Sequence, residues 1–112
     1  MKQQLTKEQS IELFDMGIPA SAATGSFIEE PSGDTHSWTY PVFTIGDLCE
    51  VLPKSIDNDP YHTLAIMYVW DEWEVHYNYA EIEKICGKEL VDTLYAAVIW
   101  CIDNGHIKTG TK

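Results

Sequence analysis

The chain has 112 residues, 45% of them hydrophobic, and is predicted to form a single domain over residues 1–112. Its 18 acidic residues outnumber seven lysines, and it contains no arginine, so the formal net charge is −11. This composition excludes a disordered chain, a collagen and a disulfide scaffold, and it argues against direct nucleic-acid binding, which needs a basic surface.

The first third of the chain is predicted to form one helix followed by a loop. Thr6 and Gln9 have the spacing of a capping box, so a helix should begin after Thr6. Gly17 suits the left-handed position that follows a helix. Residues 20–35 are small, polar and punctuated by Gly and Pro, which is typical of a loop. Within it, Phe27–Ile28 is expected to anchor the loop or to form a short strand.

A strand and a second helix are predicted next. Residues 36–40 alternate between ring-bearing and small polar side chains, a period of two that indicates a strand, and Pro41 either ends this strand or confines it to a sheet edge. Thr44 and Asp47 have cap spacing before an apolar stripe, which predicts a helix that ends at Pro53. The stripe comprises Ile45, Leu48, Cys49 and Leu52.

Residues 63–79 are predicted to form a β-hairpin whose strands, 63–70 and 73–79, are joined at Asp71 and Glu72. A two-residue loop there pairs Trp70 with Trp73 and sorts the apolar side chains onto one core face. A four-residue loop keeps this facing, whereas a bulged loop of odd length does not. The core face of this register carries Leu64, Ile66, Tyr68, Trp70, Trp73, Val75, Tyr77 and Tyr79.

The last third is predicted to be helical. Asn78 and Glu81 have cap spacing, and apolar residues follow at Ile82, Ile85 and Cys86, so a short helix or a loop with one helical turn is expected there. Residues 88–104 carry the strongest helical pattern and are followed by Gly105, a typical helix end.

Apolar positions of this last helix span roughly 200° of its circumference, about twice the ~100° stripe that one packing layer requires. Either the chain covers the helix on two sides, or part of the helix meets another chain. Trp100 falls on the polar side, and Trp is enriched at binding hot spots. Trp100, with Ile99 and Tyr95, is therefore the candidate protein-contact site, unless the first helix or the 20–35 loop folds over it.

These elements predict a small α+β domain. Its antiparallel sheet is expected to combine the hairpin 63–79 with the strand near 36–40, packed by three to four helices. The second and last helices should cover one face of the sheet, with the first helix at their edge.

Metal and cofactor sites are not expected. The histidines lack the short spacings of zinc sites. Asp57–Asp59 opens like a calcium-binding loop, but its sixth position is not glycine and its twelfth is Tyr68 instead of glutamate. The four histidines are His36, His62, His76 and His106.

Catalytic residues are not predicted either. A catalytic thiolate needs an electropositive, partly exposed setting, whereas the three cysteines fall at predicted core positions of an acidic chain. Asp71, Glu72 and Glu74 lie at the predicted hairpin turn, where a solvated turn explains them. An enzyme with a dispersed site stays an alternative that the spacing of residues does not favour.

Two further features predict a cytoplasmic protein that does not enter a membrane. The first ten residues contain no apolar run of a secretory signal, and the longest apolar runs, Leu64–Trp70 and Leu94–Ile102, are far shorter than the ~20 residues that span a bilayer. Cys49, Cys86 and Cys101 form an odd set without a CxxC pair, which indicates reduced, buried thiols.

Four segments carry a resemblance to a known group of proteins. They are TKEQSIELFDMGIP (6–19), PVFTIGDLCEVLPKSI (41–56), WEVHY (73–77) and LVDTLYAAVIWCIDNGHI (90–107). The chain resembles small uncharacterised proteins of gut bacteria and of their phages or mobile elements. The resemblance implies a cytoplasmic accessory protein linked to a mobile element. No activity is known for the group, so no functional residue is carried over.

The expected function is that of a non-enzymatic protein-binding module. Its partner is an unidentified protein or a second copy of the chain, as a homodimer. The alternative is an acidic nucleic-acid mimic that inhibits a DNA-binding protein, because a net charge of −11 on a small domain can imitate phosphates.

Overall fold

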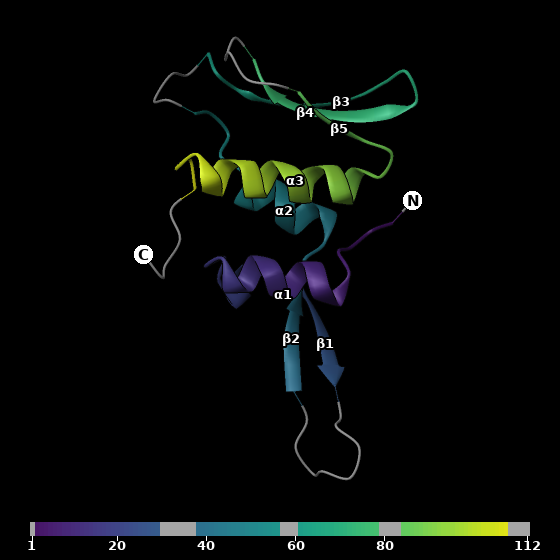
Figure 1. Cartoon of the computed structure of the whole chain (residues 1–112), viewed down its shortest axis with the longest axis vertical. Coiled ribbons are helices and arrows are strands. Elements are labelled where there is room, and N and C mark those ends of the chain that lie inside the picture. Colours follow the sequence, from purple (N-terminus) through teal and green to yellow (C-terminus); the bar gives the residue numbers. More distant parts are fainter. Residues whose placement is uncertain (1, 30–37, 57–60, 79–83, 108–112) are drawn as a thin grey trace.

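A computed structural model describes residues 2–29, 38–56, 61–78 and 84–107. Within these ranges the chain is α+β, as predicted, with three α-helices and two small antiparallel sheets. Figure 1 shows the layers: one sheet, then two helices side by side, then the first helix, with the second sheet beyond it. The elements are α1 (Lys7–Asp15), the 3-10 turn η1 (Ala20–Ala22), β1 (Gly25–Glu29), β2 (Trp38–Val42), α2 (Ile45–Val51), β3 (Leu64–Val69), β4 (Glu72–Tyr77), β5 (Ile85–Gly87) and α3 (Leu90–Asp103).

Helix α1 begins where its capping box predicts. The backbone N–H of Gln9 donates to Thr6 Oγ1 at 3.2 Å, and the backbone N–H of Thr6 donates to Gln9 Oε1 at 3.0 Å. After the helix, Gly17 has a φ of 106°, which confirms the left-handed residue expected there.

The segment before α1 is hydrogen-bonded to the residues between β2 and α2. The backbone N–H of Leu5 donates to the carbonyl of Phe43 at 2.9 Å, and the backbone N–H of Ile45 donates to the backbone carbonyl of Gln3 at 3.0 Å. The backbone N–H of Phe43 in turn donates to the buried hydroxyl of Ser10 at 3.3 Å. These bonds hold the chain between β2 and α2 against α1, with Phe43 fully buried in the core.

Helix α2 has the predicted cap, and the capping residue Asp47 also binds the segment before β1. The Asp47 backbone N–H donates to Thr44 Oγ1, while Asp47 Oδ2 accepts the backbone N–H of Thr44 at 2.9 Å. The same oxygen accepts the backbone N–H of Thr24 at 2.9 Å and its hydroxyl at 3.1 Å. One buried carboxylate therefore fixes both the start of α2 and the approach to β1.

The predicted single sheet is wrong in its pairing. The strand near 36–40 appears as β2, and it pairs with β1 and not with the hairpin. Pro41 opposes Ser26 in this two-stranded sheet, where every strand is an edge and the missing N–H of proline is tolerated. The strand alternative for Phe27–Ile28 is confirmed, whereas His36 lies outside the described residues.

The hairpin over 63–79 is confirmed, but its predicted register is wrong by two residues. The turn is Trp70–Asp71, one position earlier than expected, so Tyr68 opposes Trp73 where Val75 was expected. Because the shift is an even number, the same side chains still share a face. Trp70 itself leaves the predicted core face for the turn, and Tyr79 lies outside the described residues. The observed pairs on the inner face are Leu64–Tyr77, Ile66–Val75 and Tyr68–Trp73.

The helical turn predicted around Ile85 and Cys86 is also wrong. Residues 85–87 form β5, which pairs with β4, so the described chain has three α-helices and lacks a fourth. Gly87 lets this strand approach α3 closely: a Cβ there would lie 2.5 Å from Thr93 Oγ1. The Glu81 and Ile82 part of that prediction lies outside the described residues.

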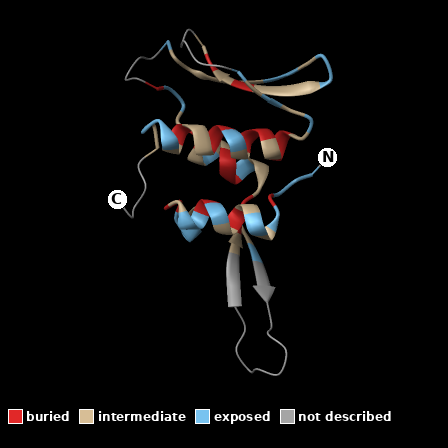
Figure 2. Ribbon diagram, viewed as in Figure 1, coloured by how far each residue is buried: buried red, intermediate tan, exposed pale blue. Residues whose placement is uncertain are grey.

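Helix α3 is confirmed and lies at the centre of the molecule. It packs against β4 and β5 on one side and against α2 on another, so the chain itself covers the wide apolar arc on two sides (Figure 1). Figure 2 shows buried residues concentrated on the helices and β4, whereas β3 has none. Helix α1 lies on the opposite side of α2 and α3 from the larger sheet, instead of at the edge of these two helices as predicted. Within the described ranges, the length and apolar character of the helices do not suffice to cross a bilayer.

Candidate functional site

The turn between β3 and β4 holds an aromatic residue in a conformation that disfavours it. Trp70 has a φ of 53° and Asp71 a φ of 63°, the two positive angles of a type I′ hairpin turn. Such turns favour Asn-Gly, because a side chain at a left-handed position costs about 1–2 kcal/mol. Trp70 is also 93% exposed, so packing within this chain does not compensate for the conformation.

Two exposed side chains extend the apolar surface from the turn along β3. Tyr68 is 57% exposed and Met67 41% exposed. The ring of Tyr68 lies 5.1 Å from that of Trp73 at an interplanar angle of 56°, which fixes the tyrosine beside the turn. We refer to Met67, Tyr68 and Trp70 as the exposed end of the hairpin. Met67 and Tyr68 are consecutive strand residues, so they expose apolar surface on opposite faces of the sheet beside the same turn.

Backbone groups of β3 also face outward. The larger sheet has the order β3–β4–β5, so among the described residues β3 is an edge strand. In a hairpin with a two-residue turn, the flanking Val69 and Glu72 exchange hydrogen bonds, and the residues that do so alternate along the strand. Ile66 and Tyr68 therefore direct N–H and C=O away from β4. Leu64 follows the same rule, because its N–H donates to the Lys54 carbonyl at 2.9 Å on the outer side.

The predicted contact residues of the last helix lie apart from this site. The hydroxyl of Tyr95 donates to a carboxylate oxygen of Glu12 on α1, and burial together with this carboxylate raises the pKa of Tyr95. Trp100 is half-buried and stacks on the ring of His106 with centroids 5.1 Å apart, and Ile99 is half-buried as well. Tyr95 is thus engaged within the chain, while Trp100 and Ile99 keep part of their surface in solvent.

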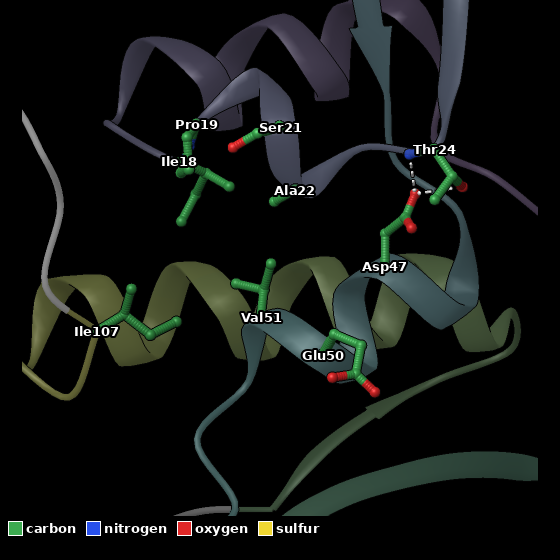
Figure 3. Close-up of a pocket in the computed structure, with 9 residues that line it drawn as sticks. All are labelled: Ile18, Pro19, Ser21, Ala22, Thr24, Asp47, Glu50, Val51 and Ile107. Atoms are coloured by element: carbon green, nitrogen blue, oxygen red, sulfur yellow. Dashed lines mark hydrogen bonds between the residues drawn. The ribbon is translucent and has the colours of Figure 1, made fainter.

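A shallow hollow of about 490 Å³ lies between η1, α2 and the residue Ile107 (Figure 3). Its middle is bordered by apolar side chains such as Ile18 and Val51, whereas Asp47 turns toward Thr24 and hydrogen bonds to it. Burial raises the pKa of Asp47, but the hydrogen bonds from Thr44 and Thr24 outweigh burial and hold it below the usual range. The carboxylate is thus a structural anion, and its bonds to Thr24 and Thr44 oppose a role in proton transfer.

The cysteines occupy three different environments, and the prediction that all three are buried is wrong. Cys101 is buried, Cys49 is half-buried and Cys86 is exposed on β5, and all three are free thiols. Sequence periodicity assigned Cys86 to a helix stripe, but as a strand residue opposite Glu74 it lies on the outer face of the sheet. Burial raises the pKa of Cys101, and it also raises the pKa of Cys49, which opposes thiolate formation in both.

We expect the native protein to react with a thiol-directed maleimide in a graded order. Cys86 should be labelled rapidly, Cys49 slowly and Cys101 only when the chain unfolds, because reagent access follows exposure. Peptide mapping by mass spectrometry after timed quenching measures each site. Rapid labelling of Cys101, or protection of Cys86, would contradict the environments described here.

Acidic and histidine side chains do not gather into a metal site in the described part of the chain. No group of three or more Cys, His, Asp or Glu is arranged there to hold an ion. Glu74 instead lies 3.9 Å from Lys84, a neighbouring cation, and Asp71 is exposed in the turn. The Asp57–Asp59 segment lies outside the described residues.

Comparison with known proteins adds no further assignment. No protein-family model matches the chain, and no similar curated protein or solved structure was found. The exposed end of the hairpin is therefore identified as the candidate functional site from its geometry alone.

Proposed function

We propose that this chain is a non-enzymatic protein-binding module and that the exposed end of the hairpin is its contact surface. The observation that carries the proposal is Trp70, which is 93% exposed in an unfavourable left-handed conformation. Backbone outliers that packing does not explain are found preferentially at functional sites. Trp and Tyr are also enriched among the residues that contribute most of the binding energy at protein interfaces.

The setting of the module is part of the same proposal. We place it in the cytoplasm as an accessory protein linked to a phage or mobile element, which rests on the resemblance in sequence. The nucleic-acid mimic receives less support, because exposed acids such as Glu8, Glu50, Asp71 and Asp103 are spread over different elements. A mimic needs its charges on one contiguous face.

Replacing the turn tests whether Trp70 is kept at a cost to stability. The double substitution Trp70→Asn and Asp71→Gly supplies the residues that a type I′ turn favours. We expect it to raise the free energy of unfolding by about 1–2 kcal/mol, since the left-handed conformation then costs little. Urea denaturation measures the change. A loss of stability would instead mean that Trp70 contributes to the fold.

Capture of partners tests the binding function itself. Tagged wild-type protein and three variants would be used to capture partners from the host that encodes the chain, with quantitative mass spectrometry as the readout. Trp70→Ser removes the exposed ring, Trp100→Asp alters the rival surface on α3, and Phe14→Ser removes an exposed aromatic from α1. A specific partner lost only with Trp70→Ser supports the proposal. Loss only with Trp100→Asp would transfer the contact to α3, and retention in all variants would overturn both surfaces.

A further inference from the structure

We propose that the free edge of β3 pairs antiparallel with β3 of a second copy of this chain, joining the two larger sheets into one. This inference rests on the proposed binding function, because it names the partner of the exposed end of the hairpin. It follows from the composition and exposure of β3, from the contrast with β2 and β5, and from the direction of the backbone groups of Ile66 and Tyr68.

Strand β3 has the sequence of a covered strand in an uncovered position. All six residues, Leu64–Val69, are hydrophobic, a pattern typical of strands that are buried on both faces. None of the six is buried, whereas β4 buries both Val75 and Tyr77. The reason is the position of α3, which packs against β4 and β5 and leaves β3 at the outer border of the sheet. Among the described residues, this strand therefore has no neighbour on its outer side, although its composition is typical of a strand that has one.

Two other edge strands, β2 and β5, carry protection that β3 lacks. Edge strands are commonly blunted by proline, by charge or by short length, because free backbone groups attract other strands. Pro41 interrupts β2, and β5 has only three residues and is followed by Lys88. The chain at 54–56 covers only the start of this edge, through the bridge from Ser55 to Thr63 and the hydrogen bond from the Leu64 N–H to the Lys54 carbonyl. Residues 65–69 contain neither proline nor charge.

The register follows from pairing all five residues of the free stretch, which centres the pair on Met67. Antiparallel pairing of 65–69 with the same residues of a second copy places Met67 opposite Met67 of that copy. Ile66 then opposes Tyr68, and these are the residues whose N–H and C=O point outward, so each such pair exchanges both of its hydrogen bonds. The two-fold axis is perpendicular to the sheet, the symmetry of the commonest homodimers.

The same arrangement covers the exposed end of the hairpin and is compatible with the acidic charge. Met67 and Tyr68 lie on or beside the seam, and the turn with Trp70 meets the start of β3 in the other copy. At the start of β3, the carbonyl of Lys54 accepts the N–H of Leu64. In the dimer, the exposed carboxylate of Asp71 from one copy therefore approaches the segment of the other copy that carries the Lys54 ammonium. The net charge of −11 opposes association over longer distances, and salt screens it, so dimerisation should strengthen with ionic strength.

A charge exchange at Met67 tests the register directly. Met67→Lys places two like charges opposite each other across the two-fold axis, and Met67→Glu does the same with the opposite sign. Each variant alone should weaken the dimer at least ~5-fold, whereas an equal mixture of the two should recover it. Cys86→Lys and Cys86→Glu are the matched controls, because they bring the same charges to the same outer face on the far strand. Light scattering coupled to gel filtration measures the mass, and circular dichroism checks the fold.

Each outcome of this experiment decides the inference. A wild-type dimer that the Met67 variants disrupt singly and restore together, with the Cys86 controls unaffected, supports it. A wild type that stays monomeric up to about 1 mM overturns self-pairing. A dimer that ignores the Met67 charges overturns the β3 edge as its seam. A monomer that still captures a different protein through Trp70 retains the proposed function and loses only this inference.

Discussion

Phe43→Ala is expected to lower the free energy of unfolding by about 3–5 kcal/mol, a large part of the ~5–15 kcal/mol that stabilises a domain of this size. Phe43 is 0% exposed, and its backbone bonds to both Leu5 and Ser10 hold α1 against the chain that leads into α2. Removing the ring leaves a cavity that these bonded neighbours cannot easily fill. Urea denaturation followed by circular dichroism measures the loss.

Phe14→Ala is the matched control for this substitution. It removes the same side chain from α1, but Phe14 is 47% exposed, so we expect a loss below about 1 kcal/mol. Equal losses for the two substitutions would show that the core is not centred on Phe43.

The second large effect is expected from Asp47, which is only 6% exposed. Asp47→Ala removes the acceptor for the backbone N–H groups of Thr24 and Thr44 and for the Thr24 hydroxyl. We expect a loss of about 2–4 kcal/mol near neutral pH, because hydrogen bonds to a charged group are strong and the donors are left without a partner. Asp47→Asn keeps an acceptor oxygen without the charge and should cost less.

The contribution of Asp47 should depend on pH with a defined sign. Hydrogen bonds hold its pKa in the folded chain below the ordinary value, so the unfolded chain binds the proton more readily. The stabilisation is present above the ordinary aspartate pKa of about 3.9 and is lost as the pH falls below it. The stability difference between wild type and Asp47→Asn should therefore shrink from about pH 5 to about pH 2. Glu50→Gln, an exposed carboxylate on the same helix, controls for the change in net charge. A difference that grows on acidification would contradict the hydrogen-bonded carboxylate.

Local signals in the sequence predicted the helices well. The cap pairs Thr6–Gln9 and Thr44–Asp47 act within one turn of chain, so residue spacing alone locates them, and both helices begin there. The end of the first helix is predictable in the same way, because Gly17 adopts the positive φ that follows a helix at little cost. These features depend on neighbours in the chain and are accessible without a structure.

Pairing between distant segments could not be predicted in the same way. Nothing in residues 36–40 distinguishes β1 from the hairpin as a partner, and Ile85–Cys86 fits a helical stripe as well as it fits a strand. The predicted register is wrong for a specific reason. Asp71–Glu72 is more polar than Trp70–Asp71, and polarity favours it as the turn. The chain instead turns at Trp70, against turn preference, and this departure is also what identifies the candidate site.

The hydrogen bonds between α1 and α3 set a time order for folding during synthesis. Gln9 donates to Asp92 and Tyr95 donates to Glu12, and each pair is separated by 83 residues. At a synthesis rate of ~5–20 residues per second, the first helix waits roughly 4–17 s for these partners to be made. The final position of α1 against α3 is therefore set only after nearly the whole chain has been made.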